Sequence, residues 1–260
     1  MIRSLWIAKT GMEGQQSALD AISNNLANVA TNGYKRGGVA FEDLMYQNLR
    51  AAGTASSEQS QLPTGLQVGL GVRVAASTRN FSQGTLQQTG NQLDLAINGA
   101  GFFQLTLPDG TTGYTRDGGF QTDASGQIVN VSGYVLQPGL TVPAGSTGVT
   151  VASDGTVNIT LAGQVAPVKL GQIQLASFVN PPGLEPRGGN IFGETAASGS
   201  PNAAAPASSG HGSLQQGYTE GSNVNVVQEL VNMIATQRAY ELNSKAIQTS
   251  DQMLQRLGQL

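Results

Sequence analysis

The stretch "ANVATNGYKR", Ala27 to Arg36, closes the only long amphipathic pattern in the first half of the chain. Apolar residues recur at helical spacing from Met1 to about Ala30, which predicts an N-terminal helix. Asn32 and Gly33 end it, because both tolerate the left-handed conformation common at helix C-termini. The pattern is a heptad seam of Leu5, Met12, Leu19 and Leu26, seven apart, with Ala8, Ile22 and Val29 three positions beyond members of that set.

A second heptad pattern occupies the C-terminal end. Asn225 is the predicted N-cap, with Gln228 three residues later in a variant of the capping box. The helix is expected to run to Gly258. A heptad seam buries itself only against another helix, so the two terminal helices are predicted to pair. The second seam consists of Val226, Met233, Tyr240, Ile247 and Leu254, with Leu230 and Leu257 beside them.

The residues between the two helices change period. Segments such as "LDLAIN", "GFFQLTL" and "TVNITL" alternate apolar and polar residues or carry β-branched runs. The predicted fold class is therefore α+β: discontinuous terminal α-helices forming a coiled-coil domain, with a central antiparallel all-β domain. The segments are separated by dipeptides that favour tight hairpin turns, namely Asn98-Gly99, Asp109-Gly110, Asp117-Gly118 and Asp154-Gly155.

Two low-complexity stretches divide the chain. Residues 51–65 are too poor in apolar side chains to fold alone, and residues 196–213 are interpreted as a flexible linker. The predicted organisation is a helical polymerisation domain over 1–35 and 222–260, an extended connecting segment over 36–78 and 214–221, a central β-domain over 79–195, and the linker over 196–213.

The composition disfavours several classes of partner. The 260 residues include 13 Lys and Arg against 16 Asp and Glu, a net charge of -3, so no basic field exists to hold nucleic acid or an acidic membrane surface. Only 11% of the residues are charged. A surface rich in uncharged polar groups suits burial against neighbouring proteins, because burying charge costs more. A low-charge secreted β-protein is the alternative at this point.

The sequence offers little for chemistry. It has no Cys, and its single His, His211, lies in the expected linker, so neither a His-centred triad nor a multi-histidine metal site can be built. We expect no catalytic residue, no cofactor and no metal. The start of the chain is not expected to be a cleaved signal peptide, and no run approaches a membrane span. The carboxylates most suited to paired catalysis sit mainly at turn signals: Asp94, Asp109, Asp117, Asp123 and Asp154.

The paired terminal seams are predicted to be marginal by themselves, because two helices bury little apolar area against the cost of ordering them. Their second faces are rich in small and uncharged polar residues, which suits contacts with other copies. We therefore expect the ends to order on polymerisation; a stable intramolecular hairpin is the alternative. Arg238, with Glu241 and Lys245, fits either ordinary helix-face pairing or an inter-subunit salt bridge. The predicted assembly residues are Leu5, Met12, Leu19, Ile22, Leu26, Val29, Asn32, Gly33, Tyr34, Val226, Leu230, Met233, Arg238, Tyr240, Ile247 and Leu254.

Several motifs carry a resemblance to a known family. "SNNLANVATNGYKR", "EGSNVNVVQELVNMI" and "TQRAYELNSKAIQTSDQML", together with the internal "FSQGTLQQTGNQLDLAINGAGFFQL" and "YTRDGGFQTDASGQIVN", resemble the bacterial flagellar axial proteins, the rod and hook family. The resemblance implies a non-enzymatic subunit that polymerises with itself through its terminal helices into an inner tube, with the β-domain outside. It implies export through the flagellar type III apparatus without a cleaved signal, and no nucleic-acid partner.

One segment bears on the branch of the family. Phe41 to Ser77 resembles the extended insertion of distal rod members, which hook members generally lack and which is taken to lock neighbours into a straight tube. The resemblance thus implies a drive shaft in the basal body that spans the periplasm and transmits torque. The implied partners are proximal rod subunits, hook subunits, the rod cap, and ring proteins in the peptidoglycan and outer membrane. A hook or proximal-rod subunit is the alternative, and a secreted carbohydrate-binding or hydrolytic β-protein a distant one. The insertion residues singled out are Tyr46, Leu49, Leu62, Leu66 and Val68.

Overall fold

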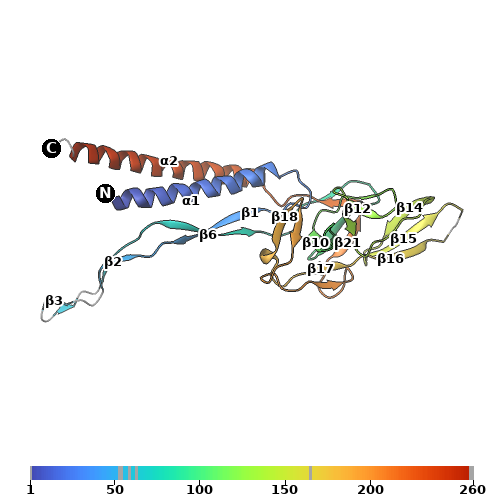
Figure 1. The fold of residues 1–260 in the computed structure, drawn as a ribbon. Helices are drawn as coiled ribbons and strands as arrows, with labels where there is room; N and C mark the ends of the chain where they lie inside the picture. Colours follow the sequence, from blue (N-terminus) through green and yellow to red (C-terminus); the bar gives the residue numbers. More distant parts are fainter. Residues whose placement is uncertain (1, 52–54, 58–59, 62–63, 164–165, 258–260) are drawn as a thin grey trace. The chain divides into compact units, whose positions relative to one another are not determined.

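The computed structural model describes residues 2–51, 55–57, 60–61, 64–163 and 166–257. The chain forms two compact units. The first comprises Met1–Leu26, Gly37–Thr78 and Asn225–Leu260, and the second comprises Ala27–Arg36 and Arg79–Val224. Terminal helices and a central antiparallel β-structure are both present, so the predicted α+β class is confirmed (Figure 1). No helix of the described residues is long and apolar enough to cross a membrane.

The first unit holds two long helices and an extended arm of strands. Helix α1 spans Ile2–Ala27 and helix α2 spans Val226–Leu257. Asn225 caps α2, because its side-chain oxygen accepts a hydrogen bond from the amide of Gln228 at 3.2 Å. The arm consists of nested two-stranded pairs, β1 with β6, β2 with β5 and β3 with β4. Its strands are β1 (Gly37–Asp43), β2 (Gln47–Arg50), β3 (Ala55–Ser57), β4 (Ser60–Gln61), β5 (Leu66–Val68) and β6 (Val72–Arg79).

The two helices lie side by side and antiparallel (Figure 1). Near one end of the pair, the Asn25 side-chain amide donates to the Glu229 carboxylate at 3.2 Å. Further along, a Cβ placed on Gly11 would lie 2.9 Å from the Asn243 amide nitrogen, so the helices approach closely there. The other side of α1 meets the arm, because a Cβ on Gly14 would lie 3.3 Å from the Phe41 ring. Helix α1 is thus packed between α2 and the first strands of the arm.

The buried row of α2 differs from the predicted seam. Its two buried residues are polar, Glu229 and Ser250, and the half-buried residues between them include the polar Thr236 and Asn243 at the same seven-residue spacing. Of the predicted seam, Met233 and Ile247 are half-buried, whereas Val226, Tyr240 and Leu254 are exposed. The expectation that Val226, Tyr240 and Leu254 lie in the seam with α1 is therefore corrected. Close approach at Gly11 leaves room for an asparagine rather than a large apolar side chain.

The second unit is built on a nine-stranded sheet. Its main order is β11-β12-β13-β9-β10-β19-β18, with β17 joining β9 to β20. A three-stranded sheet, β14-β15-β16, and two pairs, β8 with β21 and β7 with β22, complete it. The strands are β7 (Leu86–Gln88), β8 (Leu95–Asn98), β9 (Phe102–Thr106), β10 (Thr112–Thr115), β11 (Phe120–Thr122), β12 (Ile128–Asn130), β13 (Val135–Leu136), β14 (Ser146–Val151), β15 (Thr156–Leu161), β16 (Val168–Gln172), β17 (Leu175–Ser177), β18 (Glu185–Gly188), β19 (Ile191–Gly193), β20 (Asn202–Ala204), β21 (Ser213–Gln216) and β22 (Tyr218–Glu220), with a 3-10 turn at Pro181–Gly183.

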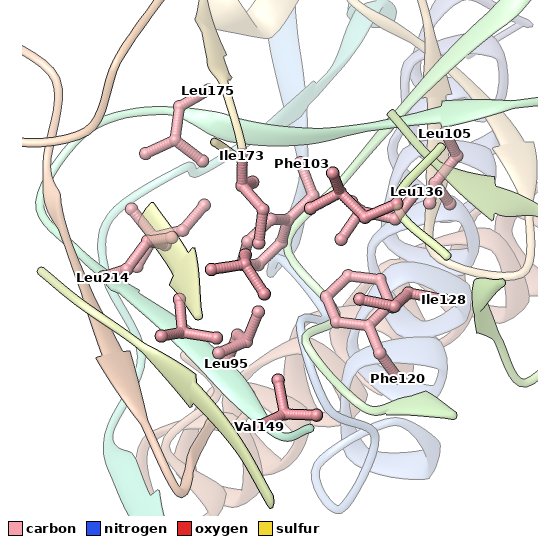
Figure 2. Packing of buried hydrophobic residues seen from close by; sticks show 14 of the residues in the cluster. Leu95, Phe103, Leu105, Phe120, Ile128, Leu136, Val149, Ile173, Leu175 and Leu214 are labelled. Atoms are coloured by element: carbon pink, nitrogen blue, oxygen red, sulfur yellow. The ribbon is translucent and has the colours of Figure 1, made fainter. Parts of the chain in front are cut away.

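The core of the second unit is apolar and closely packed. Figure 2 shows its main cluster, in which side chains from many strands meet around Phe103 and Ile173. A smaller aromatic cluster lies around Phe102, whose ring meets Phe178 and Phe192 edge to face at 5.9 and 6.2 Å. Edge-to-face contacts are a favoured arrangement of aromatic pairs. The second unit therefore has a core of its own, as an independently folding domain requires.

The expected flexible linker at 196–213 is an ordered part of the second unit. Strand β20 pairs with β17, and Ser198 is fully buried. His211 is also buried, with Nδ1 3.1 Å from the Ser208 carbonyl oxygen and Nε2 3.0 Å from the Asn202 carbonyl oxygen. The linker prediction is therefore wrong. A small, polar composition favours disorder, but here local turns and strand pairing satisfy the backbone groups of the segment.

Candidate assembly surfaces

An apolar row lies exposed along one side of α2. Val227, Val231 and Ile234 follow one another at helical spacing, and each is more than half exposed. Leu242 is 67% exposed further along the helix, and Met253 is also exposed. Large contiguous apolar patches on a protein surface mark sites of interaction. Because most seam positions of α2 that meet α1 are polar, its apolar surface is directed largely away from its own chain.

The predicted assembly residues of the two terminal motifs, Asn32 to Tyr34 aside, differ in exposure and include buried, half-buried and exposed side chains. On α1, Ile22 is buried, and the exposed apolar side chains are instead Trp6 and Ile7, which the heptad pattern missed. The members of the predicted set that are exposed on α2 are Val226, Leu230, Arg238, Tyr240 and Leu254. The half-buried members of the set are Leu5, Met12, Leu19, Leu26 and Val29 from the N-terminal seam, and Met233 and Ile247 from the C-terminal one.

The arm exposes a second group of apolar side chains. Tyr46, Leu49 and Leu66 are each about half exposed, Val68 is half-buried, and Leu62 lies outside the described residues. Sequence reasoning did not single out Met45, which is 85% exposed, although it lies beside Tyr46. A two-stranded ribbon is marginally stable by itself in water. Its exposed apolar residues therefore suit burial against another molecule.

Gly33 and Tyr34 have a different place from the one predicted. Both are buried within the second unit, so the expectation that they contact another subunit is corrected. The Gly33 amide donates to the Glu220 carbonyl at 2.7 Å, and the Arg79 guanidinium lies 5.7 Å from the centre of the Tyr34 ring. The Asn32 side chain is exposed, and the Asn32 backbone carbonyl accepts a hydrogen bond from the Asn190 side-chain amide at 2.8 Å. This end of the N-terminal motif is held by its own chain.

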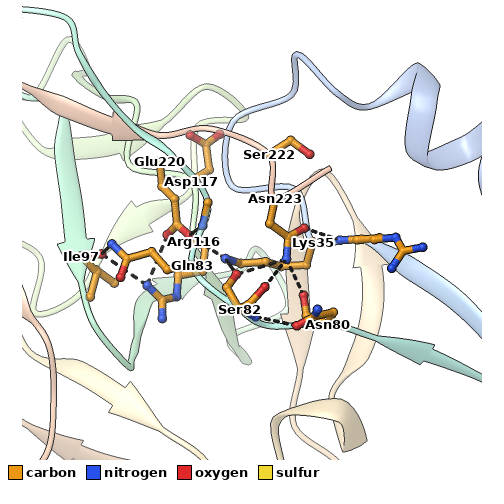
Figure 3. Close-up of polar contacts among 12 residues, drawn as sticks. Lys35, Asn80, Ser82, Gln83, Ile97, Arg116, Asp117, Glu220, Ser222 and Asn223 are labelled. Carbon is orange, nitrogen blue, oxygen red and sulfur yellow. Dashed lines mark hydrogen bonds and ion pairs between the residues drawn. The ribbon is translucent and has the colours of Figure 1, made fainter. Parts of the chain in front are cut away.

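A buried charge cluster lies beside these residues (Figure 3). The Lys35 ammonium is 2.6 Å from one oxygen of Glu220, and the Arg116 guanidinium is 3.2 Å from the other. The side chains of Lys35 and Glu220 are fully buried. Burial lowers the pKa of Lys35 and of Arg116, and the Glu220 carboxylate opposes that lowering for both. No local sequence signal links these residues, because Lys35 and Glu220 are 185 positions apart.

Two asparagines make further contacts between distant segments. Within the first unit, Asn25 pairs with the backbone of Gly37 through both ends of its amide, at 2.8 Å each. Within the second unit, the Asn223 side chain accepts from the Arg36 amide at 2.7 Å and donates to the Asn80 carbonyl at 2.8 Å. Buried or partly buried amides that are fully hydrogen-bonded specify one arrangement of the chain.

The acidic side chains considered for catalysis accept hydrogen bonds from residues close to them in the sequence. Asp109, Asp123 and Asp154 accept hydrogen bonds from residues two positions later, and these bonds lower the pKa of each carboxyl. Asp94 accepts from Thr89 and Asn91. Burial raises the pKa of Asp117, whose carboxylate accepts from the Gly119 amide. Among the described residues, no three His, Cys, Asp or Glu side chains are grouped to hold a metal ion.

Three family models match separate parts of the chain. Residues 5–35 match the flagella basal body rod protein model, residues 96–159 match the flagellar hook protein FlgE/F/G D1 domain, and residues 215–260 match the flagellar basal body rod FlgEFG protein C-terminal model. The first and third of these cover most of α1 and all of α2, and the second lies within the second unit.

Flagellar basal-body rod proteins are also similar to this chain over their full length, whereas a hook protein is similar over part of it. The flagellar basal-body rod protein FlgG of Buchnera aphidicola subsp. Acyrthosiphon pisum is 56% identical over 260 residues, which cover 100% of both chains. The protein of that name from Caulobacter vibrioides is 49% identical, over 100% of this chain and 99% of its own length. The flagellar hook protein FlgE of Helicobacter mustelae is 44% identical over only 53% of this chain and 30% of its own.

Proposed function

The chain belongs to the family of flagellar basal-body rod proteins and is a structural subunit of the flagellar distal rod, and we propose that its exposed helix and arm residues form the contacts between subunits. It lies in the flagellar basal body, where it polymerises with itself and with other axial subunits. The observation that carries the proposal is the apolar row of α2, which its own chain leaves exposed.

The proposed polymer is a straight, hollow tube that spans the periplasm and transmits torque to the hook. Proximal rod subunits and hook subunits are its proposed axial neighbours, and the rings in the peptidoglycan and outer membrane surround it. Its low content of charged residues supports rotation within those rings, because a weakly charged surface presents few fixed electrostatic barriers. The exposed apolar side chains of the arm support a role for the arm in stiffening the tube. The subunit would perform no catalysis.

Export is proposed to run through the flagellar type III apparatus without a cleaved signal, and assembly beneath a rod cap. A hook or proximal-rod subunit is less favoured, because the similarity to a hook protein covers 53% of the chain whereas the similarity to rod proteins covers all of it. No feature of the described residues favours a secreted carbohydrate-binding protein.

Replacing one exposed apolar residue of α2 tests the proposed surface. Leu242→Asp places a charge where the proposal buries an apolar side chain against another copy, and desolvating an unpaired charge is costly. We expect the variant to keep the helix content of the free protein but to abolish rods with hooks in cells that make it as their only copy. Circular dichroism and electron microscopy of isolated basal bodies measure the two effects.

The matched control is Gln237→Asp, which introduces the same charge at an exposed polar position of α2. It should leave rods in place, since it removes no apolar contact. Normal numbers of rods with Leu242→Asp would contradict the assignment of this surface.

A further inference from the structure

The chain passes between its two units at four points, after residues 26, 36, 78 and 224. Three segments of the second unit adjoin these crossings: residues 27–36, residues 79–84 and residues 218–224. Any torque carried by the chain from one unit to the other enters the second unit through these segments. How they are fastened there therefore bears directly on a subunit that transmits torque.

The buried charge cluster joins all three segments. Glu220, from the last segment, pairs with Lys35 of the first at 2.6 Å and accepts a hydrogen bond from the Gly84 amide of the second at 2.8 Å. Lys35 also donates to the Ser82 carbonyl at 2.9 Å. Arg116 pairs with the free side of the Glu220 carboxylate and donates to the Gly99 carbonyl at 2.6 Å, which anchors the cluster to the β-structure.

Asn223 joins the same three segments through uncharged hydrogen-bonding groups. Its side chain accepts from the Arg36 amide and donates to the carbonyls of Asn80 and Ser82. The Asn80 amide in turn donates to the Arg36 carbonyl at 2.9 Å. Each of the three segments is thus hydrogen-bonded to both of the others. Figure 3 shows the charged and amide parts side by side.

A charge cluster of this kind is a poor means of gaining stability alone. The desolvation of two cations and a carboxylate offsets their attraction, and apolar residues of similar volume often stabilise a core equally well. The hydrogen bonds of the cluster, however, weaken steeply when their geometry is distorted, so they resist displacement of one segment past another. The property that this cluster supplies best is a fixed geometry.

We propose that Lys35, Arg116, Glu220 and Asn223 form a joint that holds the inter-unit chain connections rigidly, so that torque passes through each subunit without slippage. The proposal rests on the proposed function, because it requires that the polymer transmit torque. Lys35, Glu220 and Asn223 are then positioning residues rather than contacts with a partner.

Two variants of the full-length protein test the joint. Glu220→Gln removes the shared charge, and Asn223→Ala removes the amide contacts without leaving a buried charge unpaired. Glu42→Gln is the matched control, because Glu42 pairs with Arg73 at 2.9 Å but is exposed and lies in the arm. Hydrogen exchange of the purified proteins should be about tenfold faster or more at the Gly84 amide in the first variant and at the Arg36 amide in the second. Amides of β9 and β10 should be unchanged.

The functional readout is rotation under load in cells that make each variant as their only copy. We expect normal numbers of rods with hooks, normal rotation at low viscous load, and loss of rotation at high load for both joint variants, with Glu42→Gln normal throughout. Unchanged exchange, or normal rotation at every load, would overturn the proposal. Rods missing despite a folded protein, or unfolding of β9 and β10 in both variants, would also overturn it, because the cluster would then serve assembly or general stability.

Failure of the proposed function would look different. Antibody labelling would then find no copies of the unaltered protein in isolated rods, whatever the behaviour of the variants.

Discussion

Gly33 is a position where only glycine fits the fold. Its φ is +69°, and a Cβ placed there would lie 2.5 Å from the amide nitrogen of Asp117. We predict that Gly33→Ala lowers the free energy of unfolding by about 2 to 4 kcal/mol, because the backbone it would strike cannot move aside as a flexible side chain could. Urea denaturation of the full-length protein, followed by circular dichroism, measures the change.

Gly133 provides the matched control for that substitution. Its φ is +83°, but a Cβ there would meet nothing within 4 Å. Gly133→Ala should therefore cost only the left-handed backbone strain, about 1 to 2 kcal/mol. An equal decrease in the free energy of unfolding for the two variants would show that the close approach to Asp117 does not contribute to the cost at Gly33.

The same residue shows what the sequence could and could not predict. The left-handed φ of Gly33 is a local property of glycine, but the pair Asn32-Gly33 does not itself end the helix: α1 ends at Ala27, and Gly33 lies in the turn that follows. The burial of Lys35 could not be predicted in this way. Its partner Glu220 lies on a distant strand, and a lysine after a helix is more often explained by the helix dipole than by a buried ion pair.

At the scale of the elements, both terminal helices were predicted because their period repeats over several heptads. The face that α2 turns toward α1 was not. A heptad of Glu229, Thr236, Asn243 and Ser250 runs beside the apolar one, and sequence reasoning favours the apolar row as the seam. When a helix also serves contacts between copies, its apolar residues need not face its own chain. That distinction depends on the assembly, which periodicity does not describe.

A substitution of His211 tests whether residues 199–212 are ordered. The buried ring lies against the carbonyls of Ser208 and Asn202, so His211→Ala leaves these groups without their side-chain partner. We expect the free energy of unfolding to fall by about 1 to 3 kcal/mol. We also expect the segment to become sensitive to a broad-specificity protease, with cleavage sites identified by mass spectrometry.

Ser200→Ala is the control, since Ser200 is exposed in the same segment. It should be cleaved as slowly as the unaltered protein. Rapid cleavage of the unaltered protein itself between 199 and 212 would restore the interpretation of this segment as a flexible linker.

At the scale of the whole molecule, the question is which residues the β-unit needs in order to fold: residues 79–195 alone, or also the segments before and after them. The sequence indicates a β-domain over 79–195, because the hairpin signals are confined to that range. The structure adds β21 and β22 from beyond it, which pair with β8 and β7, and it adds residues 27–36 from before the arm. Leu214 of β21 is part of the main core cluster.

We therefore predict that a fragment of residues 27–224 unfolds cooperatively and that a fragment of residues 79–195 does not. The shorter fragment leaves β7 and β8 without their partners, removes Leu214 from the core and deprives buried Arg116 of Glu220. An unpaired buried charge is strongly destabilising. Thermal unfolding followed by circular dichroism compares the two. A third fragment, 79–224, retains Glu220 but lacks Lys35 and Gly33, so it should fold with a lower midpoint than 27–224. A cooperative transition of 79–195 at the midpoint of 27–224 would mean that the terminal connections are accessories to the β-unit, and the joint would lose its structural basis.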